Sequence, residues 1–130
     1  APYRSKVKVI GLVGSTRMVE LLNSSKVAFF PNLRDASPRV LAEALSTNVP
    51  AVVNQNIYGG WKYINEWTGT FFQGVDDLEQ AFLRVLNNPK LDPRKWFKRH
   101  YGIPNSGRRL YEWIKSIEPK ATPAKYYVLR

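Results

Sequence analysis

The chain has 130 residues, no cysteine and one histidine, and its 20 lysines and arginines outnumber its 10 acidic residues to give a net charge of +10. This length allows one domain that buries roughly two-thirds of its unfolded surface. The lack of cysteine excludes a disulfide framework and a thiolate metal site, and one histidine among scattered acids offers no convincing metal cluster. No apolar stretch reaches the ~18 residues of a membrane helix.

The basic excess lies near the carboxyl end. Residues 91–130 hold ten basic and three acidic side chains, whereas residues 1–90 hold ten and seven. A basic end predicts an acidic partner, which could be a phosphate, nucleic acid, an anionic membrane or another domain. We expect a cytoplasmic protein, with association to a membrane surface as an open alternative.

The first elements are predicted to follow the order strand, glycine turn, helix, strand, which is a βαβ unit. Residues 7–10 form the first expected strand, and Gly11 and Gly14 frame the turn after it. The helix that Ser15 would cap carries three apolar residues on one face, namely Met18, Leu21 and Leu22. Residues 26–30 are a short apolar run of the kind that a parallel sheet buries.

The segment after that strand predicts a loop that turns into a helix. Ser37 is a good N-cap, and Pro38 suits the first helical position. The free N–H groups of residues 39–41 would then attract a phosphate. Asp35 stays in the loop, while Glu43 lies about 9 Å along the axis from Ser37 at ~1.5 Å per residue. The two carboxylates therefore suit opposite ends of a long ligand rather than one atom.

This helix is expected to bury four apolar side chains, which are Val40, Leu41, Ala44 and Leu45. Asn48 tolerates the left-handed conformation that a helix end often requires. The next strand is residues 50–53, and the polar loop after it contains Gly59 and Gly60. Ligands bind at the carboxyl ends of strands in open α/β sheets, although the two glycines could equally form a simple turn.

The second half is predicted to be mainly helical. Residues 61–66 suit a short helix and residues 68–72 a turn into a last strand. Asp76 and Glu79 form a capping box for a helix with an apolar stripe at residues 78–86. Asp92 and Pro93 begin another helix. A final helix with apolar positions Leu110, Tyr111, Trp113, Ile114 and Ile117 ends before Pro119, and residues 126–129 form a strand or an arm.

Residues 94–101 mix cations with aromatic rings, as surfaces for single-stranded nucleic acid do. Helical spacing gives a plainer account, which we favour: Trp96 and Phe97 pack inward while the charges face water. His100 is expected at the surface near a helix end, where a partial charge suits the helix dipole.

Residues 35–53, DASPRVLAEALSTNVPAVV, resemble the donor-binding segment of retaining glycosyltransferases of the GT-B fold (group 1, family 4-like). Glu43, Ala44, Pro50 and Val52 match the family pattern outright. Three positions depart from it: Asp35 stands where the family usually has Glu, and Ala36 and Asn48 stand where it has Gly. The order of strand, glycine loop, short helix and Thr-Gly turn extends the resemblance over roughly residues 7–87.

The resemblance implies an α/β fold, with a Rossmann-like parallel sheet of about four strands and flanking helices that form the second half of a GT-B donor domain. Residues 1–90 would be the partial nucleotide-sugar-binding domain. Residues 91–130 would be basic, aromatic helices and a tail that pack on the same domain or on a partner. Because the family's first half is missing and the chain lacks an initial Met, we expect a fragment that needs the rest of the enzyme or another chain and is inactive alone.

Carried over to matching positions, the resemblance implies that Asp35 is the catalytic residue that contacts the donor sugar, and that Glu43 accepts hydrogen bonds from the ribose. The backbone at Ser37, Pro38, Arg39 and Val40 would face the sugar and diphosphate. Leu12 and Val13 would lie against the base, and Gly59 and Gly60 would contact the donor.

The reaction so implied moves a sugar from a nucleotide-diphosphate sugar to the hydroxyl of an acceptor glycan or other substrate, with retention and with no cofactor or metal. Positive charge for the departing diphosphate would come from the helix start and from nearby cations, Arg34 or Arg39. Two alternatives stay open: a basic module that binds nucleic acid or a membrane surface, with nucleic acid the weaker candidate, and a degenerate pseudoenzyme that only binds nucleotide.

Overall fold

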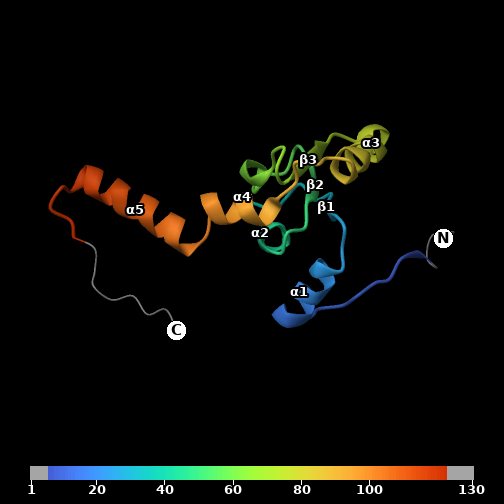
Figure 1. Cartoon of the computed structure of the whole chain (residues 1–130), viewed down its shortest axis with the longest axis horizontal. Coiled ribbons are helices and arrows are strands. Elements are labelled where there is room, and N and C mark those ends of the chain that lie inside the picture. The colour runs from blue at the N-terminus through green and yellow to red at the C-terminus, as the bar shows by residue number, and fades with distance from the viewer. Residues whose placement is uncertain (1–5, 123–130) are drawn as a thin grey trace.

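The structure, a computed structural model, describes residues 6–122. Three short strands, β1 (Ala28–Phe30), β2 (Ala51–Asn54) and β3 (Gly69–Phe72), form one parallel sheet in the order β1-β2-β3 (Figure 1). Because the strands run the same way, their carboxyl ends share one edge of the sheet. The class is therefore α/β as predicted, although the described residues contain three strands where about four were expected.

The central strand, β2, is buried on both faces. Ala51 pairs with Ala28 of β1 and with Gly69 of β3, and Ala51, Val52 and Val53 are fully buried. A Cβ at position 69 would collide with the carbonyl oxygen of Ala51. Glycine at that position therefore allows the close approach of β3 to β2.

One face of the sheet is covered by α2 (Arg39–Ser46) and α4 (Pro93–His100). Leu41 and Leu45 of α2 pack in one cluster with Val53 of β2, and Phe97 of α4 packs against the same cluster. A hydrogen bond also ties α4 to the end of α2, because the backbone N–H of Arg94 donates to the side-chain oxygen of Asn48 over 3.1 Å. This helix therefore belongs to the same packed body as the sheet.

The opposite face is covered by α3 (Val75–Leu86). Ala81 and Val85 pack against Val52 and Phe72 of the sheet. Phe29 of β1 extends the same layer, with its ring centroid 5.3 Å from that of Phe72. The sheet thus lies between two helical layers, as in doubly wound α/β proteins.

The start of α3 differs from the predicted capping box of Asp76 and Glu79. Gly74 is the N-cap, and the carboxylate of Asp77 accepts hydrogen bonds from the N–H of Gly74 at 3.0 Å and of Gln73 at 2.9 Å. These two donors lower the pKa of Asp77 below its usual value. The prediction chose the wrong pair because any acid near a helix start can satisfy the sequence pattern.

The first helix, α1 (Ser15–Asn23), packs beside α2. Leu22 contacts the cluster formed with Ala44 and Val49, and Met18 packs against it. Gly14 is the N-cap, so Ser15 is the first helical residue rather than the predicted cap.

Residues 7–10 do not form the predicted strand. They run as extended backbone leading to α1, and Val7 and Val9 are 62% and 89% exposed (Figure 1). An extended apolar run becomes a strand only when a neighbouring strand accepts its hydrogen bonds, and among the described residues none lies beside it. The fourth predicted strand is therefore absent because residues 7–10 have no strand to pair with, although their apolar pattern suits a strand.

Other local predictions are confirmed with small shifts. Asn48 adopts φ 68°, and Asp92 caps α4 by accepting from the N–H of Lys95 at 3.3 Å. A 3-10 turn over Trp61–Tyr63 replaces the expected helix at residues 61–66.

The last helix, α5 (Ile103–Ile117), extends away from the sheet (Figure 1). It ends before Pro119 as predicted. The arm expected at residues 126–129 lies outside the described residues. Within residues 6–122 no helix has the length and apolar character needed to cross a membrane.

Candidate functional site

Two loops meet at the carboxyl edge of the sheet. Residues 31–38 follow β1 and residues 55–60 follow β2. The N–H of Tyr58 donates to the carbonyl of Leu33 over 3.0 Å. A Cβ at Gly59 would collide with the backbone of Ala36. The two loops are therefore packed backbone against backbone, and glycine is required for that approach.

The second glycine of the loop lies over the start of α2. Gly60 has φ +76°, a left-handed conformation that favours glycine. A Cβ there would lie 2.5 Å from Cγ of Pro38 and 3.0 Å from a methyl carbon of Leu41. The glycine pair thus forms one wall beside the helix start, which supports a structural role in addition to the predicted donor contact.

The loop at residues 31–38 is shaped by Asp35. Its Oδ1 accepts a hydrogen bond from the N–H of Ser37 at 3.0 Å, which is an Asx turn, and Asn32 donates weakly to Oδ2 over 3.4 Å. Ser37 is therefore not the predicted N-cap. The helix begins at Arg39 with Pro38 as its N-cap, and no side chain caps it.

The start of α2 keeps unsatisfied donors, because the first N–H groups of an α-helix have no partner inside the helix. Pro38 is buried, whereas Arg39 and Val40 are exposed. Val40 was predicted to be buried and is 40% exposed. The helix turns it away from the core face that Leu41 and Leu45 occupy. The helix start is thus closed on the side of Pro38 and open on the side of Arg39.

Glu43 and Arg39 lie four residues apart and so share one face of α2. Glu43 is half-buried and Arg39 is exposed. Among the ion pairs within residues 6–122, neither side chain takes part. Both groups are therefore available to a ligand that lies along this face, with Glu43 about 6 Å along the helix axis from Arg39.

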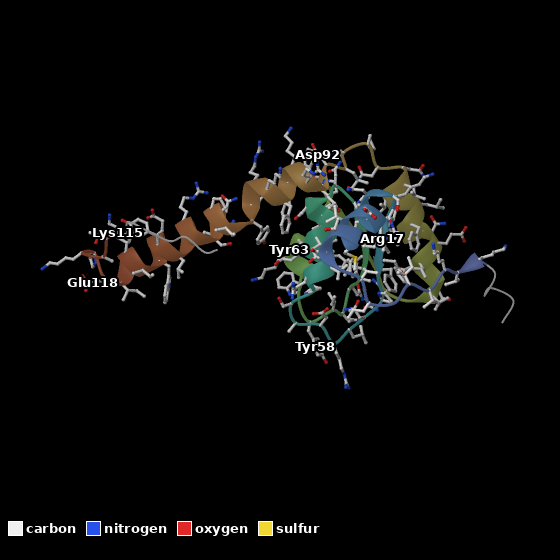
Figure 2. The ribbon with its side chains drawn as sticks, turned by 90° about the horizontal axis from the view of Figure 1, so that it is seen from below. Arg17, Tyr58, Tyr63, Asp92, Lys115 and Glu118 are labelled. Atoms are coloured by element: carbon white, nitrogen blue, oxygen red, sulfur yellow. The ribbon has the colours of Figure 1, made fainter. Side chains whose placement is uncertain are left out.

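A cleft of about 370 Å³ opens beside the two loops. Ala36 of the first loop and Tyr101, the residue after α4, line two sides of it. The remaining lining residues come from the second loop and the turn after it, namely Tyr58, Gly59, Gly60, Trp61, Lys62 and Tyr63. Figure 2 shows Tyr58 and Tyr63 from below the view of Figure 1. Six of the lining residues were not predicted as site residues, namely Ala36, Tyr58, Trp61, Lys62, Tyr63 and Tyr101. Lys62 follows the glycine pair directly, which was an available signal, whereas Tyr101 reaches the cleft only through the packing of α4.

A sequence model described as glycosyl transferases group 1 matches residues 2–100. The chain belongs to this family. No curated protein and no solved structure matches it. The match spans every candidate site residue of the donor segment and ends with the last residue of α4, so α5 lies beyond it.

Two site residues that the family resemblance implies lie in the segment before α1, outside the two loops. Leu12 is fully exposed and Val13 is half-buried, in the extended segment before α1. Gly11 and Gly14, on either side of them, have no atoms within 4 Å of a built Cβ. The contact of this glycosyltransferase segment with a base stays a prediction.

Within residues 6–122, no three His, Cys, Asp or Glu side chains gather as metal ligands. The positive groups at the carboxyl edge include the start of α2 and three exposed side chains, Arg34, Arg39 and Lys62. An anionic ligand at this edge can interact with these groups.

Proposed function

We propose that this chain is the donor-binding part of a retaining glycosyltransferase that moves a hexosyl group from a nucleotide-diphosphate sugar to an acceptor hydroxyl. Membership of the group 1 family supports glycosyl transfer in general. The observation that carries the donor assignment is the start of α2, which is uncapped by side chains and walled by the Gly59–Gly60 loop, with Glu43 and Arg39 on one face of the same helix.

In this proposal the diphosphate lies at the start of α2. The backbone at Ser37, Pro38, Arg39 and Val40 faces the sugar and diphosphate, and the positive end of the helix dipole stabilises the leaving group. The Arg39 side chain adds a full charge, and Lys62 lies at the neighbouring cleft. Charge that is fixed before the reaction stabilises the transition state without reorganisation.

The two carboxylates take different ends of the donor. Glu43, on the open face of the helix, accepts hydrogen bonds from ribose hydroxyls. Asp35, in the loop, contacts the sugar, with Gly59 and Gly60 beside it. One oxygen of Asp35 already accepts the N–H of Ser37, so the carboxylate is held in place before the sugar arrives. Leu12 and Val13 complete the site against the base.

The site also needs a further part of the enzyme or another chain. Residues 7–10 are extended without a strand partner, and β1 is an edge of the sheet in the order β1-β2-β3. Proteins normally cover or blunt the open edges of a sheet, and a further strand is one way to do so. Strands inserted between residues 7–10 and β1 would pair both and would carry Leu12 towards the site.

The test is a titration of the complete enzyme with UDP-glucose and GDP-mannose, followed by NMR. We expect shifts at Arg39, Glu43 and the Gly59–Gly60 loop, and loss of binding by tenfold or more in Glu43→Ala. Glu79→Ala, which removes an exposed carboxylate from α3, serves as the matched control. No shift at the start of α2 with either donor would refute the assignment.

Turnover separates the remaining possibilities. An active enzyme releases nucleoside diphosphate, and the anomeric configuration of its product reports retention. A degenerate pseudoenzyme would show the same NMR shifts with no release.

A further inference from the structure

A second cleft, of about 350 Å³, borders α4 and shares no lining residue with the first. It is formed where the turn before β3 meets α4, and its lining consists of Trp67, Asp92, Lys95, Trp96, Arg99 and His100. Figure 2 shows Asp92 and Tyr58, which belong to the second and first cleft, on opposite sides of the packed part of the molecule. The two clefts are neighbours, because the ring of Trp96 in this cleft lies 5.7 Å from the ring of Tyr101 in the first, but this cleft does not include the start of α2.

The two walls of this cleft are fixed to each other. The N–H of Asp92 donates to the carbonyl of Trp67 over 3.0 Å. Nearby, Lys90 and Asn88 hold Glu66, the residue before Trp67, through contacts of 2.7 and 2.8 Å. Because hydrogen bonds connect its walls, the cleft is formed before a ligand binds. Binding then costs less conformational entropy.

The aromatic side chains of the cleft are partly open. Trp67 is 43% exposed. Trp96 stacks on His100 with centroids 4.5 Å apart, and Nδ1 of His100 lies 2.8 Å from the carbonyl of Trp96, which fixes both rings. Only Phe97 therefore packs into the core as predicted. Two indoles at one cleft provide flat apolar surfaces of the kind that cover the C–H face of a sugar ring.

The charged side chains of the cleft indicate which polar groups its ligand carries. Lys95 and Arg99 lie four residues apart on α4, are exposed, and take no part in the ion pairs found within residues 6–122. Like charges so placed repel each other and favour an anion between them. Asp92 adds a carboxylate whose Oδ1 caps the helix. A carboxylate accepts hydrogen bonds from sugar hydroxyls but repels a bare phosphate or a polyanion.

We propose that this cleft binds an anionic saccharide, with its ring on the indoles, its hydroxyls on Asp92 and its acidic group on Lys95 and Arg99. The combination favours an acidic sugar over a bare phosphate, because the sugar can turn its hydroxyls to Asp92 while its acidic group lies between Lys95 and Arg99. The inference stands on this geometry alone and does not depend on the donor site.

The test is a titration of the 130-residue chain followed by tryptophan fluorescence and calorimetry. The probes are trigalacturonate as the acidic saccharide, maltotriose as the neutral one, uridine monophosphate and inorganic phosphate. We expect trigalacturonate to bind at least tenfold more tightly than each of the other three. Equal binding of maltotriose, tighter binding of uridine monophosphate or phosphate, or no binding of trigalacturonate would overturn the proposal.

Variants locate the binding and separate it from folding. Trp67→Ala and Arg99→Gln should each weaken trigalacturonate at least tenfold, whereas Trp113→Ala, on α5 and 62% exposed, should change it less than twofold. Asp92→Asn keeps a good N-cap; it should weaken trigalacturonate several-fold and strengthen phosphate. Weakening by Trp113→Ala alone, or tighter trigalacturonate in Asp92→Asn, would count against the cleft.

One variant distinguishes the proposed donor site from this cleft. Glu43→Ala should weaken nucleotide-sugar binding tenfold or more and leave trigalacturonate binding as it is. Failure of either result therefore refutes one proposal without touching the other.

Discussion

The centre of the molecule and the segments on either side of it have similar apolar patterns, but the apolar side chains are buried in the centre and exposed in the flanking segments. In the centre, Leu41, Leu45 and Val52 are fully buried between the sheet and its helices. At the ends, Val9 is 89% exposed in the segment before α1, and Ile117 of α5 is 66% exposed. Figure 2 shows Lys115 and Glu118 at the far end of α5, well away from the packed body.

This difference shows that an apolar pattern specifies which face of an element is to be covered, but not what covers it. Helix α2 and helix α5 are both amphipathic, yet α2 lies against β2, while α5 presents Leu110 and Trp113 at 56% and 62% exposure. An isolated helix of this length is marginal in water, so most of its stability has to come from packing. Substitutions should therefore have large effects at the centre and small ones at the ends of this chain.

The largest effect is expected for Leu45→Ala. The side chain is fully buried between α2 and the sheet, and removing it leaves a cavity that the surroundings fill only in part. We expect the free energy of unfolding to fall by about 2–5 kcal/mol, measured by urea denaturation. A loss below about 1 kcal/mol would mean that the centre is not the packed core described above.

Gly59→Ala should have the next largest effect. The added methyl group meets the backbone of Ala36, which cannot move aside as a flexible side chain would. We expect a loss of about 1–3 kcal/mol in the free energy of unfolding, together with weaker nucleotide-sugar binding, because the two loops are forced apart.

Gly11→Ala is the matched control for Gly59→Ala. A Cβ at Gly11 has no atom within 4 Å, so the free energy of unfolding should change by less than about 0.5 kcal/mol. Equal effects at the two glycines would remove the steric argument for the loop contact.

Much of the centre could be predicted from the sequence because its signals are local. Pro50 precedes β2 directly, Asn48 takes the left-handed conformation after α2, and Asp92 with Pro93 starts α4. The placement of Asp35 in a loop and of Glu43 on a helix follows from the same local signals.

The features that could not be predicted depend on contacts between segments, which a local sequence pattern does not specify. Ser37 was predicted to cap α2, but its N–H donates to Asp35 in an Asx turn and Pro38 is the N-cap. The helix therefore begins at Arg39, one residue later than predicted. Residues 7–10 have a strand pattern without a strand beside them. The contributions of Lys62 and Tyr101 to the first cleft depend on how loops and α4 pack, which no local spacing encodes.

A smaller effect, dependent on pH, is expected at the start of α3. The N–H groups of Gly74 and Gln73 donate to Asp77 and lower its pKa below the usual value near 3.8. The ionised form is favoured in the folded state, so this stabilisation is complete above the usual pKa and is lost as the pH falls through the lowered one. Asp77→Asn should lower the melting temperature at pH 7 and have almost no effect near pH 2.

Asp76→Asn removes the same charge one position earlier without breaking either hydrogen bond. It should lower the melting temperature at pH 7 by less than Asp77→Asn does. If the two variants behave alike at every pH, the stabilisation comes from charge near the helix start and not from the capping contact.

The smallest effect is expected for Leu110→Ala on α5. This side chain is 56% exposed, so its removal takes little apolar surface out of a packed environment. In the 130-residue chain the free energy of unfolding should change by less than about 0.5 kcal/mol, measured as for Leu45→Ala. In a complete enzyme that covers α5, the same substitution should cost about as much as a core leucine does. A cost of that size in the isolated chain would instead mean that α5 already packs against its own body, and the contrast between centre and ends would disappear.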